Sequence, residues 1–130
     1  MGKAVTRIVP AILVTGVIFF LSHQPGDLLG PYPFLWADKL AHLVVYAILC
    51  LTLIYAFPRH YRWSARRTVA AVSVIFCLVY GISDEFHQSF IPGRYPSIAD
   101  IAADTAGALL ACMLWLRLSS TEHAENPEKR

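Results

Sequence analysis

Residues with acid, base or ligand chemistry gather in three short stretches of the sequence, DKLAH, SDEFHQ and DIAAD. The first two combine acids with a histidine and an amine or amide, and the third holds two further acids. Carboxylates and imidazoles bind cations, transfer protons and shift one another's ionisation. The candidate binding residues are Asp38, Lys39, His42, Tyr46, Asp84, Glu85, Gln88, Arg94, Asp100 and Asp104.

Helical spacing places most of these side chains on shared faces. A helix turns by about 100° per residue, so positions three and four residues apart lie on the same side. The three stripes are Asp38, His42 and Tyr46; Tyr80, Gly81, Asp84 and Gln88, with Glu85 at the edge; and Ser97, Asp100, Asp104, Gly107, Ala108 and Ala111. The small residues of the third stripe allow close approach of another helix. We expect the stripes to face one another.

This predicted cluster has more acids than bases. Its five carboxylates face Lys39 and Arg94, a formal excess of three negative charges. A charge near the bilayer centre costs about 2.5–3.5 kcal/mol to insert, so compensation is expected. Protonated carboxylates, a charged His42 and a bound cation or cationic ligand remain open. The spacing matches no established zinc motif, so no metal ligands are assigned; a divalent cation is the cofactor kept open.

The elements that must position the cluster are apolar. Hydrophobic residues make up 56% of the 130-residue chain, charged residues 15%, and the mean hydropathy is +0.50. The apolar segments 5–22, 40–57, 68–90 and 98–118 lack β-barrel alternation. We therefore predict an all-α integral membrane bundle of four transmembrane helices. A signal peptide is the alternative for segment 5–22, but no small-x-small cleavage pair follows, so we expect it to be retained.

The distribution of Lys and Arg predicts the orientation. Nine of the eleven lie with the termini or in the 58–67 loop, and only Lys39 and Arg94 lie at the opposite end of the bundle. The positive-inside rule then puts both termini in the cytoplasm and the cluster outside. The transmembrane domain is expected to cover 1–118, followed by a disordered tail, 119–130. A net charge of +2 is too small to indicate a nucleic-acid partner.

The connection IPGRYP, residues 91–96, is predicted to be a tight turn. Pro92 suits the second position of a β-turn and Gly93 the third. The turn would present Arg94 at the rim of the cluster. There Arg94 either binds a phosphate or carboxylate ligand or pairs with Asp84 or Asp100, and the internal pair is favoured.

Three patterns together resemble the VanZ-like family between residues 22 and 111. They are D-K-x-x-H-x-x-x-Y from Asp38, D-E-x-x-Q-x-x-x-P-G-R from Asp84, and D-x-x-x-D-x-x-G from Asp100. The resemblance implies a small, multi-pass protein of the bacterial cytoplasmic (inner) membrane, in a family whose name-giving member is associated with teicoplanin resistance. Two positions depart from the family pattern: Asp104 replaces a usual asparagine, and Ala111 a common second glycine.

Three functions are compatible with these observations. The leading hypothesis is a protein that binds a cell-envelope component, a lipid-linked wall precursor or a glycopeptide, and contributes to teicoplanin tolerance; membrane lipid is its other expected partner. The second is an intramembrane hydrolase or transferase, with Glu85 or Asp84 as general base and His42 as acid or cation ligand, although no nucleophile motif supports it. The third is a structural protein in which the cluster fixes helix register.

Overall fold

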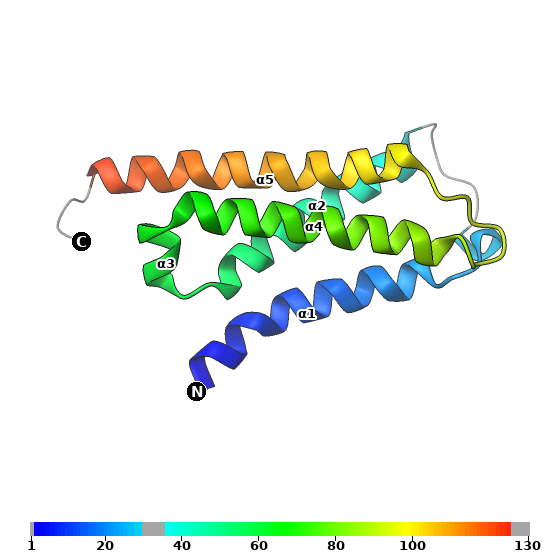
Figure 1. The fold of residues 1–130 in the computed structure, drawn as a ribbon, viewed down its shortest axis with the longest axis horizontal. Coiled ribbons are helices and arrows are strands. Elements are labelled where there is room, and N and C mark those ends of the chain that lie inside the picture. Colours follow the sequence, from blue (N-terminus) through cyan, green and yellow to red (C-terminus); the bar gives the residue numbers. More distant parts are fainter. Residues whose placement is uncertain (1, 30–35, 126–130) are drawn as a thin grey trace.

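The computed structural model describes residues 2–29 and 36–125, and these residues form an all-helical bundle (Figure 1). The prediction of an all-α protein is confirmed for this part of the chain. Two short helices in the connections, η1 and α3, were not predicted from the sequence. The helices are α1 (Gly2–Ser22), η1 (Gly26–Leu29), α2 (Ala37–Ala56), α3 (Arg59–Ser64), α4 (Arg66–Gln88) and α5 (Ile98–Glu125).

The long helices have the dimensions of membrane spans. Three apolar stretches, Ala37–Ala56, Arg66–Gln88 and Ile98–Ser120, are long enough to cross a bilayer, and Thr6–Ser22 is a shorter apolar helix. By length and composition, three to four helices can therefore span the membrane. Large apolar side chains point outward from the bundle, as lipid-facing residues do, among them Leu13, Phe76 and Leu114.

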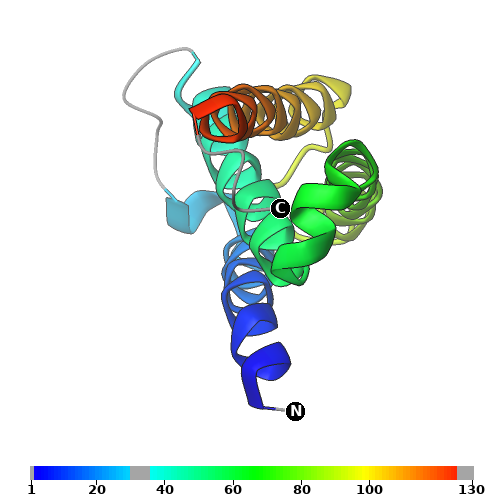
Figure 2. The ribbon, with the colours of Figure 1, turned by 90° about the vertical axis from the view of Figure 1, so that its left-hand side faces the viewer.

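Helix α2 is the centre of the bundle, because it packs against α1, α4 and α5 (Figure 2). The contact of α2 with α5 depends on Gly107. A Cβ atom there would overlap the backbone carbonyl of Leu43, so only glycine lets the two helices lie this close. The core beyond this crossing is built from small and medium side chains that include three free thiols, Cys50, Cys77 and Cys112.

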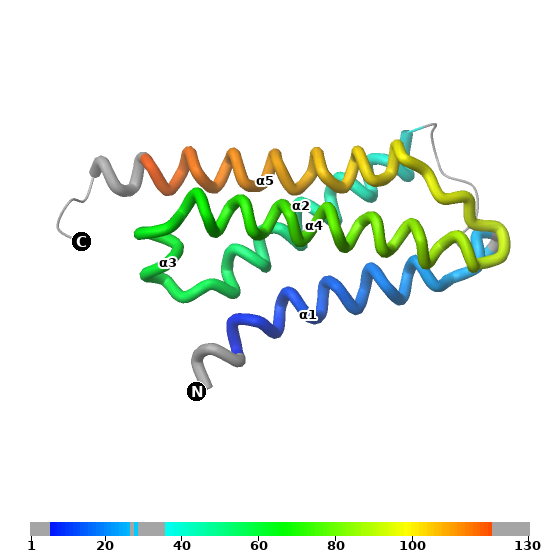
Figure 3. Tube along the Cα trace, viewed as in Figure 1, coloured from blue at the N-terminus to red at the C-terminus, as the bar shows by residue number. Residues whose placement is uncertain are grey.

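The two ends of the bundle differ in chemistry. The short α3 lies at one end of the bundle, and the turn between α4 and α5 lies at the other (Figure 3). The first end is basic, because Arg7, Arg59 and Arg62 lie near one another there. Burial lowers the pKa of Arg62, and repulsion by the positive charges of Arg7 and Arg59 lowers it further. The compartment that each end faces stays a prediction.

Helix α5 continues to Glu125 and so extends past residue 118, the predicted end of the transmembrane domain. Residues 119–125 are therefore helical in the structure, whereas 126–130 lie outside the described part. The division into a domain 1–118 and a disordered tail 119–130 stays a prediction.

Replacing Gly107 by alanine should destabilise the bundle by about 1–3 kcal/mol, because the new methyl group overlaps the Leu43 carbonyl. Thermal unfolding in detergent, followed by the reaction of the buried thiols with a fluorogenic reagent, measures the change. Gly16→Ala is the matched control, since its Cβ would meet nothing within 4 Å. Equal melting temperatures for the two variants would show that the α2–α5 approach does not limit stability.

Candidate functional site

The predicted polar stripes meet at the end of the bundle that holds the α4–α5 turn. The last turns of α1 and α4 and the first turns of α2 and α5 converge there (Figure 1). Helical periodicity correctly predicted which positions face inward. The buried members are Tyr46, Asp84, Glu85, Gln88, Asp100 and Asp104.

A histidine–aspartate pair lies between α2 and α5. His42 Nδ1 is 2.9 Å from Asp104 Oδ1, and Asp104 is only 1% exposed. A carboxylate accepts hydrogen bonds, so Nδ1 carries a proton; Nε2 then has a lone pair in the neutral ring and a second N–H in the charged ring. This arrangement is common where imidazole acts as a base or as a metal ligand, because the carboxylate fixes the ring and its tautomer.

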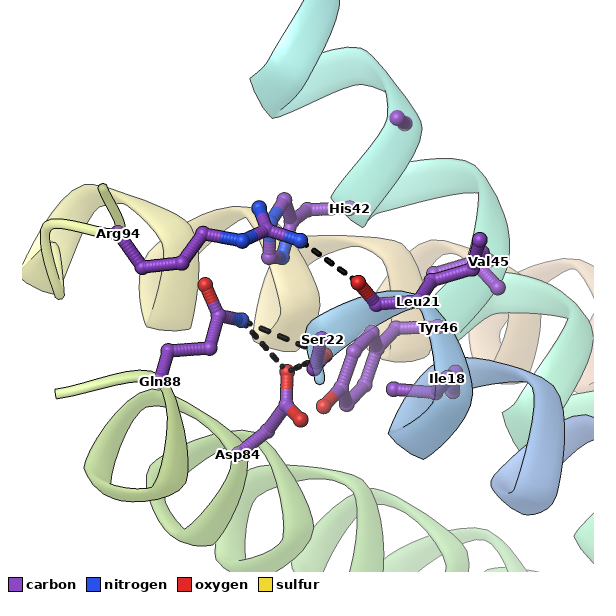
Figure 4. Close-up of a pocket in the computed structure, with 10 residues that line it drawn as sticks. Ile18, Leu21, Ser22, His42, Val45, Tyr46, Asp84, Gln88 and Arg94 are labelled. Carbon is purple, nitrogen blue, oxygen red and sulfur yellow. Dashed lines mark hydrogen bonds between the residues drawn. The ribbon is translucent and has the colours of Figure 1, made fainter. Parts of the chain in front are cut away.

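Asp84 is the centre of a second buried group, between α1 and α4 (Figure 4). The Ser22 hydroxyl donates to Asp84 Oδ2 at 2.8 Å, and Gln88 Nε2 donates to the same oxygen at 2.9 Å. Two donors on one oxygen make Asp84 a well-satisfied structural acid that ties α1 to α4. Of the two acids proposed as general base, Asp84 is therefore the less available.

Lys39 bridges two acids at the rim of the site. Its ammonium lies 2.7 Å from Asp38 Oδ2 and 2.5 Å from Asp100 Oδ1. All three side chains are partly accessible at 24%, 26% and 12% exposure, respectively, so the pairs keep one side toward solvent or headgroups. One cation thus offsets part of the charge of two carboxylates.

Arg94 does not make the expected ion pair with Asp84 or Asp100. Its Nε donates to the backbone oxygen of Gln24 at 3.1 Å, and its Nη2 donates to that of Leu21 at 2.7 Å (Figure 4). The last carbonyls of a helix lack intrahelical partners and carry partial negative charge, so they compete well for a guanidinium. Arg94 is therefore a clasp on the end of α1.

The turn that carries Arg94 was predicted correctly. Gly93 has a φ of 73°, and the Arg94 amide donates to the Ile91 carbonyl at 3.1 Å, so Pro92 and Gly93 occupy the second and third turn positions. The Gly26 amide donates to the Pro92 carbonyl at 3.1 Å. Backbone and side-chain bonds together fix the turn against the segment after α1.

Glu85 differs from the other acids of the cluster because, among the described residues, its hydrogen-bond partner is a backbone amide. It is 4% exposed, and its Oε2 accepts the Ser97 amide at 2.7 Å. Its Oε1 is buried with no hydrogen-bond partner among the described residues, and the same is true of Asp104 Oδ2 and the Tyr46 hydroxyl. Buried polar atoms are rarely left unpaired, so each of these atoms marks a position where water, an ion or a ligand group can bind.

Two cavities adjoin the cluster and share His42, Gln88 and Arg94. One, of about 220 Å³, has an otherwise mainly apolar wall that includes Ile18, Leu21 and Val45 (Figure 4). The other, of about 240 Å³, is polar, and its wall includes Lys39 and Asp100. All ten candidate residues line these cavities or lie directly behind them, as Glu85 and Asp104 do; their role in binding stays a prediction.

Sequence reasoning missed the contribution of α1 to this site. Ser22 and the carbonyls of Leu21 and Gln24 bind Asp84 and Arg94, although the first apolar segment was assigned no polar role. A serine at the very end of an apolar run was the available signal for Ser22. Backbone carbonyls have no sequence signal at all, because every residue has one.

Comparison with known proteins identifies relatives but no structural precedent. The VanZ/LLP1 family profile matches residues 7–119. An uncharacterised protein of the fission yeast Schizosaccharomyces pombe, C11E3.10, is 32% identical over 93 residues, which are 71% of this chain and 52% of that protein. The chain thus spans about half the length of this curated relative. No solved structure matches the chain.

Replacing Arg94 by glutamine should release the segment that follows α1. Charge-assisted hydrogen bonds contribute about 1.5–3 kcal/mol each, so amides of residues 23–28 should exchange with solvent about 10- to 100-fold faster. Hydrogen–deuterium exchange with mass spectrometry measures this. Arg117→Gln, an exposed position on α5, is the control. If both variants exchange at the wild-type rate, Arg94 is not the clasp.

Proposed function

The chain belongs to the VanZ/LLP1 family, and from this premise we propose that it binds the anionic headgroup of a lipid-linked cell-envelope component in its polar cluster. The observation that carries the proposal is the junction of an apolar and a polar cavity at His42, Gln88 and Arg94. A ligand that fills both must itself have an apolar chain and a polar head. Membrane lipids and lipid-linked precursors have this composition.

The polar cavity contains cationic groups for an anionic headgroup. Lys39 lies on its wall and keeps part of its surface accessible. Arg94 uses Nε and Nη2 on backbone carbonyls, which leaves Nη1 for a phosphate or carboxylate oxygen. These two residues, with His42 in its protonated form, are the groups that we assign to the anionic part of the ligand.

The apolar cavity supports a lipid rather than a soluble anion. Ile18 and Leu21 of α1 form one side of it, and Ala41 and Val45 of α2 form another. The cavity belongs to a bundle whose outer surface carries exposed apolar residues, so an acyl or isoprenoid chain can enter it from the membrane. A free phosphate ion would leave this space empty.

The second candidate function is hydrolysis or group transfer on the same ligand. The specific observation in its favour is the His42–Asp104 pair next to Glu85, whose Oε1 lacks a partner. We assign the role of general base to Glu85 rather than to Asp84, because two donors already occupy the Oδ2 atom of Asp84. Turnover of a bound lipid-linked substrate would distinguish this function from retention alone.

Narrower proposals follow from the family rather than from the site. They are an outward-facing cluster, a place in the bacterial inner membrane and a contribution to teicoplanin tolerance. Family membership supports them, and the fission-yeast relative indicates that similar sequences also occur outside bacteria.

Purified protein should retain a polyprenyl diphosphate at least about 10-fold better than the matching polyprenyl alcohol, because only the diphosphate engages Lys39 and Arg94. Native mass spectrometry of detergent micelles, with and without Mg²⁺, measures retention. Release of inorganic phosphate over time, lost in Glu85→Gln, would support the hydrolase.

A steric variant tests the apolar cavity independently of charge. Ala41→Leu should shrink the cavity and lower diphosphate retention about 10-fold. Ala102→Leu, at an exposed position of α5, should retain the ligand like the wild type. Equal retention of alcohol and diphosphate by the wild type would overturn the headgroup assignment.

A further inference from the structure

Glu85 is a buried carboxylate without a cation. The ion pairs among the described residues join Lys39 to Asp38 and Asp100, and His42 to Asp104. The Arg94 guanidinium is bound to backbone carbonyls instead. Glu85 therefore receives one backbone N–H on Oε2 and nothing on Oε1, although it is 4% exposed. An ionised carboxylate buried in this way needs a stronger partner than this, whereas a protonated one does not.

Two further ligand atoms lie beside Glu85. One ring nitrogen of His42 and one carboxylate oxygen each of Glu85 and Asp100 all lie within 4.8 Å of one another. Two atoms bound to the same ion at about 2.1 Å are at most about 4.2 Å apart. Closing the remaining gap takes a side-chain movement of less than about 1 Å. The three residues come from α2, α4 and α5, so the bundle itself holds them together.

The orientation of His42 fits metal binding. Asp104 accepts a hydrogen bond from Nδ1, so in the neutral ring the Nε2 lone pair is available to an ion. Histidine ligands in metal sites usually donate their other nitrogen to a carboxylate or carbonyl in this way. Asp104 would thus orient the ligand and would not itself need to bind.

We propose that His42, Glu85 and Asp100 bind one divalent metal ion, with Asp104 as the positioning residue behind His42. Two carboxylates and one imidazole suit a first-row ion that accepts both oxygen and nitrogen, and Mn²⁺ fits this set better than Ca²⁺ or Cu⁺. Three protein ligands leave coordination positions open. His42 and Asp100 line the polar cavity, so an open position is available to a ligand there.

The ion would also reduce the excess negative charge at this site. Five carboxylates against Lys39 and Arg94 repel an anionic headgroup, whereas a dication offsets two of the three excess charges. A bridge from the ion to a lipid headgroup rests on the proposed function. Binding of the ion itself is independent of that function, because all three proposed ligands are side chains of the protein.

The competing explanation needs no metal. Lys39 already lies 2.5 Å from Asp100, and internal water can bond to Glu85 Oε1. These groups would then satisfy the site, and added metal would find no saturable position. The two explanations differ in stoichiometry and in the residues on which binding depends.

Full-length protein, stripped with EDTA and titrated with Mn²⁺, tests the site by the electron paramagnetic resonance signal of free Mn²⁺. One ion should bind per chain, and Glu85→Gln should weaken binding at least about 100-fold, more than an outer-shell change. His87→Gln, two residues further along α4 and outside the proposed ligand set, is the control, and it should bind as the wild type does. Absence of saturable binding, or equal binding by Glu85→Gln, would overturn the proposal.

A second measurement does not depend on the stability of the Glu85 variant. Bound Mn²⁺ should show ¹⁴N coupling from an imidazole, which His42→Gln removes and His87→Gln, at the same end of the bundle, preserves. Coupling that survives in His42→Gln would contradict the assignment. The Ala41→Leu variant separates the two proposals: it should lose lipid retention and keep Mn²⁺, so a failure of one proposal can be recognised without the other.

Discussion

An ionisable side chain inside a membrane bundle must face another helix, and this constraint organises the whole structure. Acids on α2, α4 and α5 are stable there only because each is turned toward its neighbours. The helices must then approach closely, which Gly107 permits at the Leu43 carbonyl. The packing of the helices and the formation of the site therefore have the same cause, because the ionisable residues that suggest chemistry are also those that the bundle has to bury.

Helical periodicity accounts for what could be predicted from the sequence. Asp104, Asp84 and Tyr46 were assigned to inward faces by their spacing, and the structure buries all three. The turn was predictable because Pro92 and Gly93 have strong local preferences. Local rules also explain the inferred membrane-crossing segments, since apolar runs of sufficient length need no knowledge of the fold.

Pairing across helices could not be predicted in the same way. The stripes show that Arg94 and the acids share one end of the bundle, but they do not show that backbone carbonyls at and just after the end of α1 offer Arg94 a better position. Similarly, the Ser97 amide reaches Glu85 only because the chain turns back after α4. Such contacts depend on backbone paths between elements, and several residue pairs of similar chemistry compete for each one.

The attachment of α1 has a consequence for how a lipid reaches the site. The second half of α1 has several polar links to the bundle, among them Ser22 to Asp84, the Arg94 clasp, and the Tyr80 hydroxyl on the Thr15 carbonyl at 2.9 Å. The first half diverges from the other helices (Figure 2). Ile18 and Leu21, in the second half, line the apolar cavity, so α1 forms the wall between that cavity and the outer surface of the bundle. A long-chain molecule would pass sideways from the bilayer to the acids without its tail ever meeting water.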